Sequence, residues 1–386
     1  MKRKIFNRGS RQVFWRTLIS AFFWQIIRSP RLAAEDQLAY KYENYREERG
    51  RVQVATSALL FETALTSSFS AKGEFVYDAI SGATPTGGPP PPGSSEVPVV
   101  KIKDVRTAGT LELKQRIGRY SIAPQVAYSI EDDYESYGVA LNQSLDFNQK
   151  NTTLNLGLGH NFDRVLPAFS LLEFTEHKDT TDILLGVTQI LTPGTLLAVN
   201  FTYSYAEGYL SDPYKGVHFD AYPDPSTLFP ENRPRHKNKQ IALVSLTQYV
   251  EAADASIELT YRFHHDSFGI WAHTATAAWL QKLGNHVVLE PMVRYYNQTA
   301  ADFYSVRFGG DPSESLEGVP EFYSSDYRLS ALTTWTFGIK GTFKLNEHFS
   351  INAAFQRYEM TSNDHMTSAS AYPRANTYVL GATISF

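Results

Sequence analysis

The sequence predicts an all-β protein, a transmembrane antiparallel up-and-down β-barrel of about sixteen strands behind an N-terminal signal peptide. Candidate strands alternate apolar and polar side chains over roughly 10 to 14 residues, which exceeds the usual globular strand and suits a tilted bilayer crossing. Short and long connections alternate along the chain. The last strand ends on the aromatic Phe386, and a closed barrel needs its last strand to pair with its first.

Composition excludes several other classes. Hydrophobic residues make up 42% of the 386 residues and mean hydropathy is −0.30, which argues against a helical membrane protein. Cysteine is absent, so disulfides, thiolate metal sites and cysteine nucleophiles are excluded. A net charge of −4 gives no reason to expect nucleic-acid binding. Aromatic residues reach 13%, which suits the girdles of a membrane barrel but also a soluble β-sandwich.

The first 34 residues have the order of a secretory signal. Basic residues between Lys2 and Arg16 are followed by the largely apolar run 17–27 and then by "RSPRLAAEDQ". We expect cleavage after Ala34 or Ala33, with residues 35–386 as the barrel domain; a short amphipathic helix of the mature protein is the alternative. The apolar run is too short for a bilayer span, which needs about 20 residues. The predicted location is the outer membrane of a Gram-negative bacterium.

Strand alternation is clearest in residues 120–130, 197–205, 257–264, 286–296 and 334–344. In each of them one face is apolar or aromatic and the other is polar, small or charged. A soluble sandwich would share this pattern, but strand length and the order of the connections favour the barrel. The alternation does not assign faces to "IALVSLTQYV" and "AHTATAAWL".

The connections predict the strand number. Short turns are expected at the periplasmic end, and the longer links at residues 81–103, 131–135, 163–178, 207–237, 266–269, 299–325 and 361–373 are expected outside. The last strand and the strand before the turn at 66–68 would both run inward, so closure needs one more strand, which Gln37–Tyr45 supplies. The total is sixteen. Fourteen strands result if that segment does not pair, and eighteen if "PAFSLLEFTEHK" forms a hairpin.

The C-terminal strand also predicts how the barrel is recognised during assembly. One of its faces is apolar, and we expect the barrel-insertion machinery to read that face as a signal. Its residues are Tyr378, Leu380, Ala382, Ile384 and Phe386.

The polar strand faces predict a charged lumen, because Lys or Arg at the bilayer midplane of a lipid face costs roughly 2–4 kcal/mol. The charges could form a constriction that selects permeants, or could simply pair and hydrate one another. The candidate pore-lining residues are Lys72, Glu74, Arg106, Glu112, Lys114, Arg116, Glu258, Arg262, Glu290, Arg294, Lys340 and Lys344.

Two links are long enough to fill such a lumen. The first, residues 81–103, contains a proline run. The second, residues 207–237, leads into a basic cluster, which either contacts lipopolysaccharide phosphates or folds inward as an eyelet that favours anions. The cluster comprises Arg233, Arg235, His236, Lys237 and Lys239.

Four stretches resemble one bacterial family of outer-membrane barrels, catalogued as domain of unknown function 3570. They are "YDAISGATPTG" (77–87), "ENRPRHKNK" (231–239), "YRFHHDSFGIWAHT" (261–274) and "VRYYNQTAADFY" (293–304). The resemblance extends through nearly all of the mature chain. It implies a barrel in the outer membrane.

The remaining motifs favour binding or passage over chemistry, and no catalytic site, metal site or cofactor is predicted. His264 and His265 fall on opposite faces of a regular strand and cannot share one metal ion. Two acidic groups, at 132–135 and 311–317, could hold Ca²⁺, although solvated charge is the preferred interpretation. We expect a passive channel for small solutes or ions, or the barrel of a transport complex. A plugged structural or surface-interaction barrel is the alternative, and an outer-membrane hydrolase is a third hypothesis.

Overall fold

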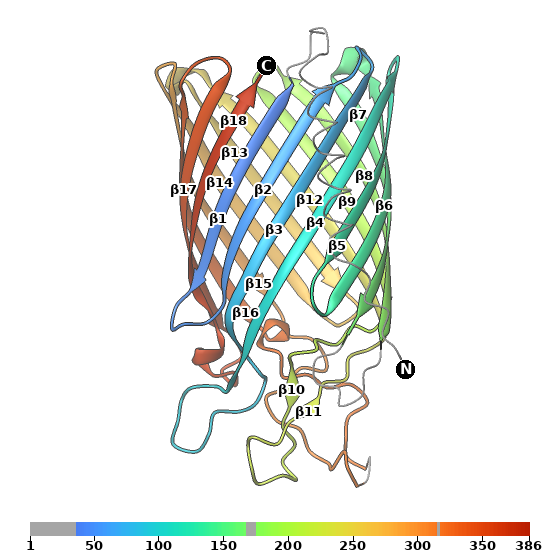
Figure 1. Ribbon diagram of the computed structural model, residues 1–386, viewed down its shortest axis with the longest axis vertical. Helices are drawn as coiled ribbons and strands as arrows, with labels where there is room; N and C mark the ends of the chain where they lie inside the picture. Colours follow the sequence, from blue (N-terminus) through green and yellow to red (C-terminus); the bar gives the residue numbers. More distant parts are fainter. Residues whose placement is uncertain (1–35, 167–174, 315–316) are drawn as a thin grey trace, which may run out of the picture.

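The computed structural model describes residues 36–166, 175–314 and 317–386. Within these residues, sixteen antiparallel strands close into one barrel (Figure 1). The first strand, β1 (Gln37–Glu47), pairs with both β2 (Gln53–Ala64) and β18 (Arg374–Ser385). The strand number and fold class are therefore confirmed, and the alternatives of fourteen strands, eighteen strands and a soluble sandwich are wrong. The predicted signal peptide, residues 1–34, lies outside the described residues.

Each of the remaining barrel strands also pairs with two neighbours. Apart from the β1–β18 closure, paired strands follow one another in the chain except β9 and β12, because two short strands lie between them. These are β10 (Gly216–Val217) and β11 (Phe229–Pro230), which pair only with each other. The remaining barrel strands are β3 (Phe69–Pro85), β4 (Val99–Ile117), β5 (Tyr120–Ile130), β6 (Tyr134–Phe147), β7 (Thr152–Val165), β8 (Glu176–Thr192), β9 (Thr195–Gly208), β12 (His236–Val250), β13 (Ala255–Asp266), β14 (Trp271–Leu283), β15 (Val287–Gln298), β16 (Leu332–Lys344) and β17 (Phe349–Ser362).

Four short 3₁₀ turns complete the described secondary structure: η1 (Asn148–Lys150), η2 (Glu251–Ala253), η3 (Tyr327–Leu329) and η4 (Ala369–Ala371). None of the described helices is long and apolar enough to span a membrane.

Closure of the barrel uses the last residue of the chain. The backbone N–H of Asp36 donates to the carbonyl of Phe386 at 3.1 Å, and the N–H of Phe386 donates back to Asp36 at 2.9 Å. Tyr378, Leu380, Ile384 and Phe386 are exposed on the outward face, as the alternation predicts. Their role as an assembly signal, together with Ala382, stays a prediction.

The outer face of the barrel is apolar and aromatic. Phe201 and Phe337 are 46% and 52% exposed, and both lie within a belt of similar side chains. Pairing also assigns the two strands whose pattern is ambiguous: Val244 of β12 and Ala275 of β14 both lie opposite the exposed Tyr261 and therefore face outward. The belt matches hydrocarbon, because lipid rather than a protein core must bury these side chains.

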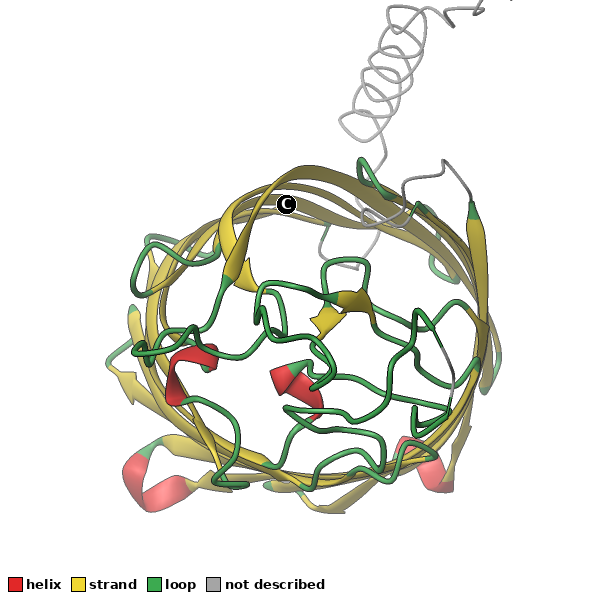
Figure 2. Cartoon of the chain, turned by 90° about the horizontal axis from the view of Figure 1, so that it is seen from below, coloured by secondary structure: helices red, strands yellow, loops and turns green. Residues whose placement is uncertain are grey.

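The buried core of the protein lies at one mouth of the barrel. Short turns join the strands at the end that holds the C-terminus, whereas the long links gather at the opposite end and cross its opening (Figures 1 and 2). Three clusters of buried hydrophobic residues occur in these links, and one of them packs Val217, Phe219 and Phe308 together. We call the described residues of the links 209–235 and 299–331 the cap.

The first long link is shorter than predicted. Ser81 pairs with Lys103 and Pro85 pairs with Val99, so β3 and β4 extend beyond the barrel wall and only residues 86–98 form the connection. The positive φ of Gly82, 120°, lets β3 pass close to the carbonyl of Arg51 before it extends. The postulated hairpin at "PAFSLLEFTEHK" falls largely on residues that are not described, but β7 pairs directly with β8.

Candidate pore and its cap

One sector of the lumen wall, on β3, β4 and β6, holds its charges in pairs. Arg106 donates to Asp78 at 2.7 Å, and Arg116 donates to Asp146 at 3.0 Å. Lys72 lies directly opposite Glu112 in the strand register. Glu74 and Lys114 share this lumenal face, opposite Thr110 and Ser70. Most predicted charges of this sector therefore have a neighbour of opposite sign.

The opposite sector, on β13 to β16, is less evenly paired. Lys340 donates to Glu290 at 3.0 Å, whereas Arg294 donates to the hydroxyl of Thr276 at 3.3 Å. Among the described residues, no ion pair joins Arg262, Arg294 or Lys344 to an acid. Glu258 occupies the same lumenal face of β13 as Arg262. This sector therefore presents an excess of positive charge to the lumen.

The predicted basic cluster is divided among three environments. Arg233 lies in the cap with 12% of its side chain exposed, and Lys237 pairs with the buried Asp266 at 2.8 Å on the lumenal face of β12. Lys239 lies on that same face, opposite Ser204. Arg235 pairs with Glu176 at the rim, and His236 faces outward beside Tyr205. Because β12 begins at His236, its side chains alternate between faces and cannot act as one patch.

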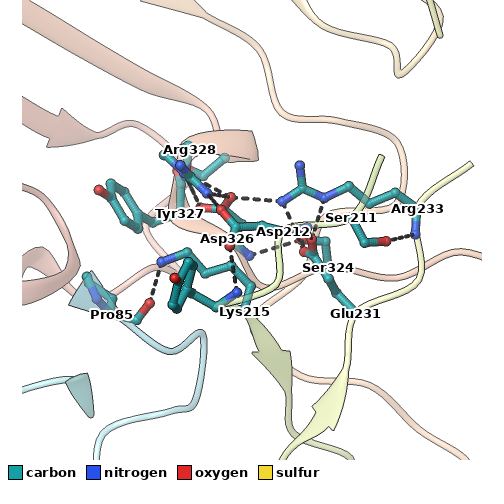
Figure 3. A network of polar contacts seen from close by, with 12 residues as sticks. Pro85, Ser211, Asp212, Lys215, Glu231, Arg233, Ser324, Asp326, Tyr327 and Arg328 are labelled. Atoms are coloured by element: carbon teal, nitrogen blue, oxygen red, sulfur yellow. Dashed lines mark hydrogen bonds and ion pairs between the residues drawn. The ribbon is translucent and has the colours of Figure 1, made fainter. Parts of the chain in front are cut away.

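An ionic cluster centred on the buried Asp326 joins the two links of the cap (Figure 3). Asp326 is 1% exposed and accepts from Arg233 of the other link at 2.9 Å and from its near neighbour Arg328 at 2.9 Å. Arg328 also reaches Asp212, and Arg233 pairs with Glu231 at 2.7 Å. Burial alone would raise the pKa of Asp326, but Arg328 and Arg233 hold it well below its ordinary value. We call these five residues the cap cluster.

Lys215 ties the cap to the part of β3 that extends beyond the barrel wall. Its ammonium is buried and donates to Thr84 Oγ1 at 2.9 Å and to the carbonyl of Pro85 at 2.5 Å. The same ammonium lies 5.7 Å from the centre of the Tyr327 ring, and the Arg51 guanidinium lies 5.8 Å from it. Desolvation lowers the pKa of Lys215. A buried charge this well solvated by protein groups indicates an ordered link rather than a free loop.

Sequence reasoning did not identify the cap cluster. Its members are far apart in the chain, and the links that carry them read as solvated loops. One signal was present: Glu231 and Asp326 each precede an arginine by two residues, as "ENR" and "DYR". That spacing is too common to predict a buried pair without knowledge of which links meet.

Three carboxylates meet at the rim of the same mouth. Oxygen atoms of Asp104, Glu131 and Asp133 lie within 4.8 Å of one another. Carboxylate oxygens are the ligands that Ca²⁺ prefers, so this group is the arrangement of described residues best suited to hold a cation. Burial, followed by the charge of Asp104, raises the pKa of Glu131 to about 7. The sequence grouped Asp132, Asp133 and Glu135, of which only Asp133 belongs to this group. Glu135 instead pairs with Arg164.

The two adjacent histidines lie on opposite faces. His264 contacts Asp266 at 3.1 Å in the lumen, whereas the ring of His265 stacks on Trp271 on the outer face. They do not form one metal site.

The closed sixteen-strand barrel with an apolar outer belt defines the class of outer-membrane β-barrels. The chain belongs to the family of proteins of unknown function DUF3570, whose model matches residues 24–384. The resemblance seen in the four sequence stretches is thereby confirmed. No curated protein matches the chain in sequence.

Solved structures resemble this chain in fold. The match to CdiB from Acinetobacter baumannii has a TM-score of 0.52 at 7% identity and covers 92% of this chain and 61% of CdiB. The siderophore receptor PirA from Pseudomonas aeruginosa gives 0.44 at 10% identity, covering 92% of this chain and 62% of PirA. OccK2 (OpdF) from Pseudomonas aeruginosa, solved with glucuronate, gives a TM-score of 0.44 at 10% identity, and the match covers 92% of this chain and 98% of OccK2. The chain spans less than two thirds of the length of PirA and CdiB.

Proposed function

We propose that this protein is a passive channel in the outer membrane of a Gram-negative bacterium, narrowed at its extracellular mouth by the cap. It passes small charged solutes or ions and performs no chemical reaction. Sixteen strands are enough to enclose an aqueous lumen. Lipid and lipopolysaccharide surround the belt, and the barrel-insertion machinery places it there.

The observation that carries this proposal is the uneven charge of the lumen wall. Arg262, Arg294 and Lys344 face the lumen without an acidic partner among the described residues, although ion pairing occurs elsewhere in the wall. Unpaired cations beside an aqueous path attract anions and slow cations.

A closed barrel is the second candidate, and the cap cluster favours it. Two links held together by buried ion pairs could obstruct the mouth completely. Such a barrel would present a rigid surface to a partner and conduct nothing.

Planar bilayers separate the two candidates. The full chain is inserted and its conductance and reversal potential are measured in a salt gradient. A channel shows stable steps with anion preference, and Arg294→Ala lowers that preference while Lys41→Ala, which removes a paired lumenal cation, changes it less. A silent barrel that begins to conduct on Asp326→Ala supports the closed form. If neither the wild type nor Asp326→Ala conducts, the channel proposal is contradicted.

A further inference from the structure

A groove of about 380 Å³ lies over β14 on the lipid-facing surface. Ala275 and Ala277 form its floor. Leu259 and Tyr261 of β13 form one wall, and Tyr295 of β15 stands on the other side. Strand pairing explains the shape, because small residues of β14 lie between larger residues of both neighbouring strands in the same rows.

A void on this face cannot stay empty within a membrane. Side chains that line a gap lose dispersion contacts with nothing in return, and acyl chains are the molecules available to restore them. A second copy of the barrel is a poor occupant, because a stable interface buries about 1,600 Å² in total and this groove lies between projecting aromatic rings.

A polar group stands at one end of the groove. His273 lies two residues from Ala275 toward the long-link end of β14 and is exposed on the same outward face. Its Nδ1 is 2.7 Å from the hydroxyl of Tyr261, a wall of the groove. With the Tyr261 hydroxyl donating to Nδ1, the proton of His273 resides on Nε2, which makes no hydrogen bond to another described residue. His273 is two residues from the first residue of β14, at the end of the strand that the proposed placement puts in the outer leaflet.

We infer that the groove and His273 together form a binding site for one outer-leaflet lipid, the phosphorylated lipid A of lipopolysaccharide. One acyl chain lies over Ala275 and Ala277, and a lipid A phosphate accepts a hydrogen bond from His273 Nε2. The inference rests on the proposed placement in the outer membrane and not on the proposed conductance.

Native mass spectrometry of the delipidated full-length barrel with added lipid A tests this site. The wild type is expected to retain one lipid at concentrations where Ala277→Leu, which fills the groove, retains about tenfold less. His273→Ala is expected to weaken the binding of phosphorylated lipid A by about tenfold, because one hydrogen bond to a charged group is lost. The binding of dephosphorylated lipid A should be unchanged. Ala353→Leu on the outward face of β17 and His348→Ala at the short-turn end are the matched controls.

Equal retention of lipid A by the wild type and by Ala277→Leu would overturn the site. A loss of lipid A in Ala353→Leu as large as the loss in Ala277→Leu would also overturn it. Stronger retention of phosphatidylglycerol than of lipid A would overturn the choice of lipid. A sucrose-gradient fractionation that finds the chain outside the outer membrane would refute the proposed placement instead, so the two failures are distinguishable.

Discussion

At the scale of single residues, Asp326 shows how one carboxylate holds two distant segments together. It is almost fully buried, yet it lies between two guanidinium groups that arrive from different links. Breaking a buried pair costs more than forming it gains, since the remaining charge stays desolvated. The cap is therefore sensitive to this residue in a way that its exposed acids are not.

Replacing Asp326 with Ala should destabilise the cap by about 1–3 kcal/mol, because Arg233, whose side chain is 12% exposed, would lose one of its two acids, whereas Arg328, 49% exposed, is solvated by water. Hydrogen exchange should quicken in residues 209–235 and 299–331 while the strands keep their protection. Asp220→Ala is the control, since its 3.9 Å pair with Arg307 is exposed and should contribute less than about 1 kcal/mol. Unchanged exchange in both segments would show that the cap does not depend on this cluster.

Glu131 should make the rim sensitive to pH. Its pKa is raised by burial and by Asp104 to about 7 from an ordinary 4.5, so folding favours its neutral form. The stabilisation is complete below the ordinary pKa and is lost as pH rises through about 7, by at most about 2 kcal/mol after solvent screening. Protection factors at residues 130–134, which correct for the intrinsic pH dependence of amide exchange, should fall between pH 5 and 8, and Glu131→Gln should remove this fall. A rim that becomes more protected with rising pH would contradict the sign.

At the scale of elements, the β3–β4 hairpin shows backbone conformation setting the length of a strand. Residues 81–85 carry Gly, Ala and Pro, which suggest a loop, but they pair with 99–103. Gly82 makes this possible, because its φ of 120° is a conformation that other residues rarely adopt. The extension then provides the carbonyl of Pro85 that Lys215 binds.

Substituting Gly82 with Ala should lower the stability of this hairpin by about 1–3 kcal/mol, through backbone strain and collision with the Arg51 carbonyl. The temperature at which the folded, heat-modifiable gel band disappears reports the loss. Gly109→Ala on β4 is the control, because no atom lies closer than 3.6 Å to its added carbon. If both variants melt together, the strained turn is not what supports the extension.

At the scale of the whole molecule, stability depends on closure, since a barrel has no free edge to expose in lipid. The first and last strands, at opposite ends of the chain, form that seam. Leu380 lies opposite Tyr42, and Ile384 lies opposite Leu38.

The native chain has no cysteine, so the seam can be tested by cross-linking. Tyr42→Cys combined with Leu380→Cys should form a disulfide on oxidation, because opposed residues in an antiparallel pair have Cα atoms roughly 4.5–5.5 Å apart. The denatured protein would then migrate faster on a non-reducing gel. Tyr42→Cys with Ile384→Cys, offset by about 13 Å along the strand, should not link. Linking of the offset pair instead would mean a different register.

The amino-acid sequence by itself determined the barrel, its strand number and the pairing of its ends. These follow from a two-residue period and from the requirement that every backbone group in lipid be paired, both of which are local or countable. Tertiary structure alone decided that Arg233 lies in a buried cluster, that Asp104 joins Glu131, and that residues 209–235 meet 299–331. Those contacts join links whose sequences have no periodicity. Their partners depend on which loops reach one another across the mouth, and the order of residues alone does not specify which loops do.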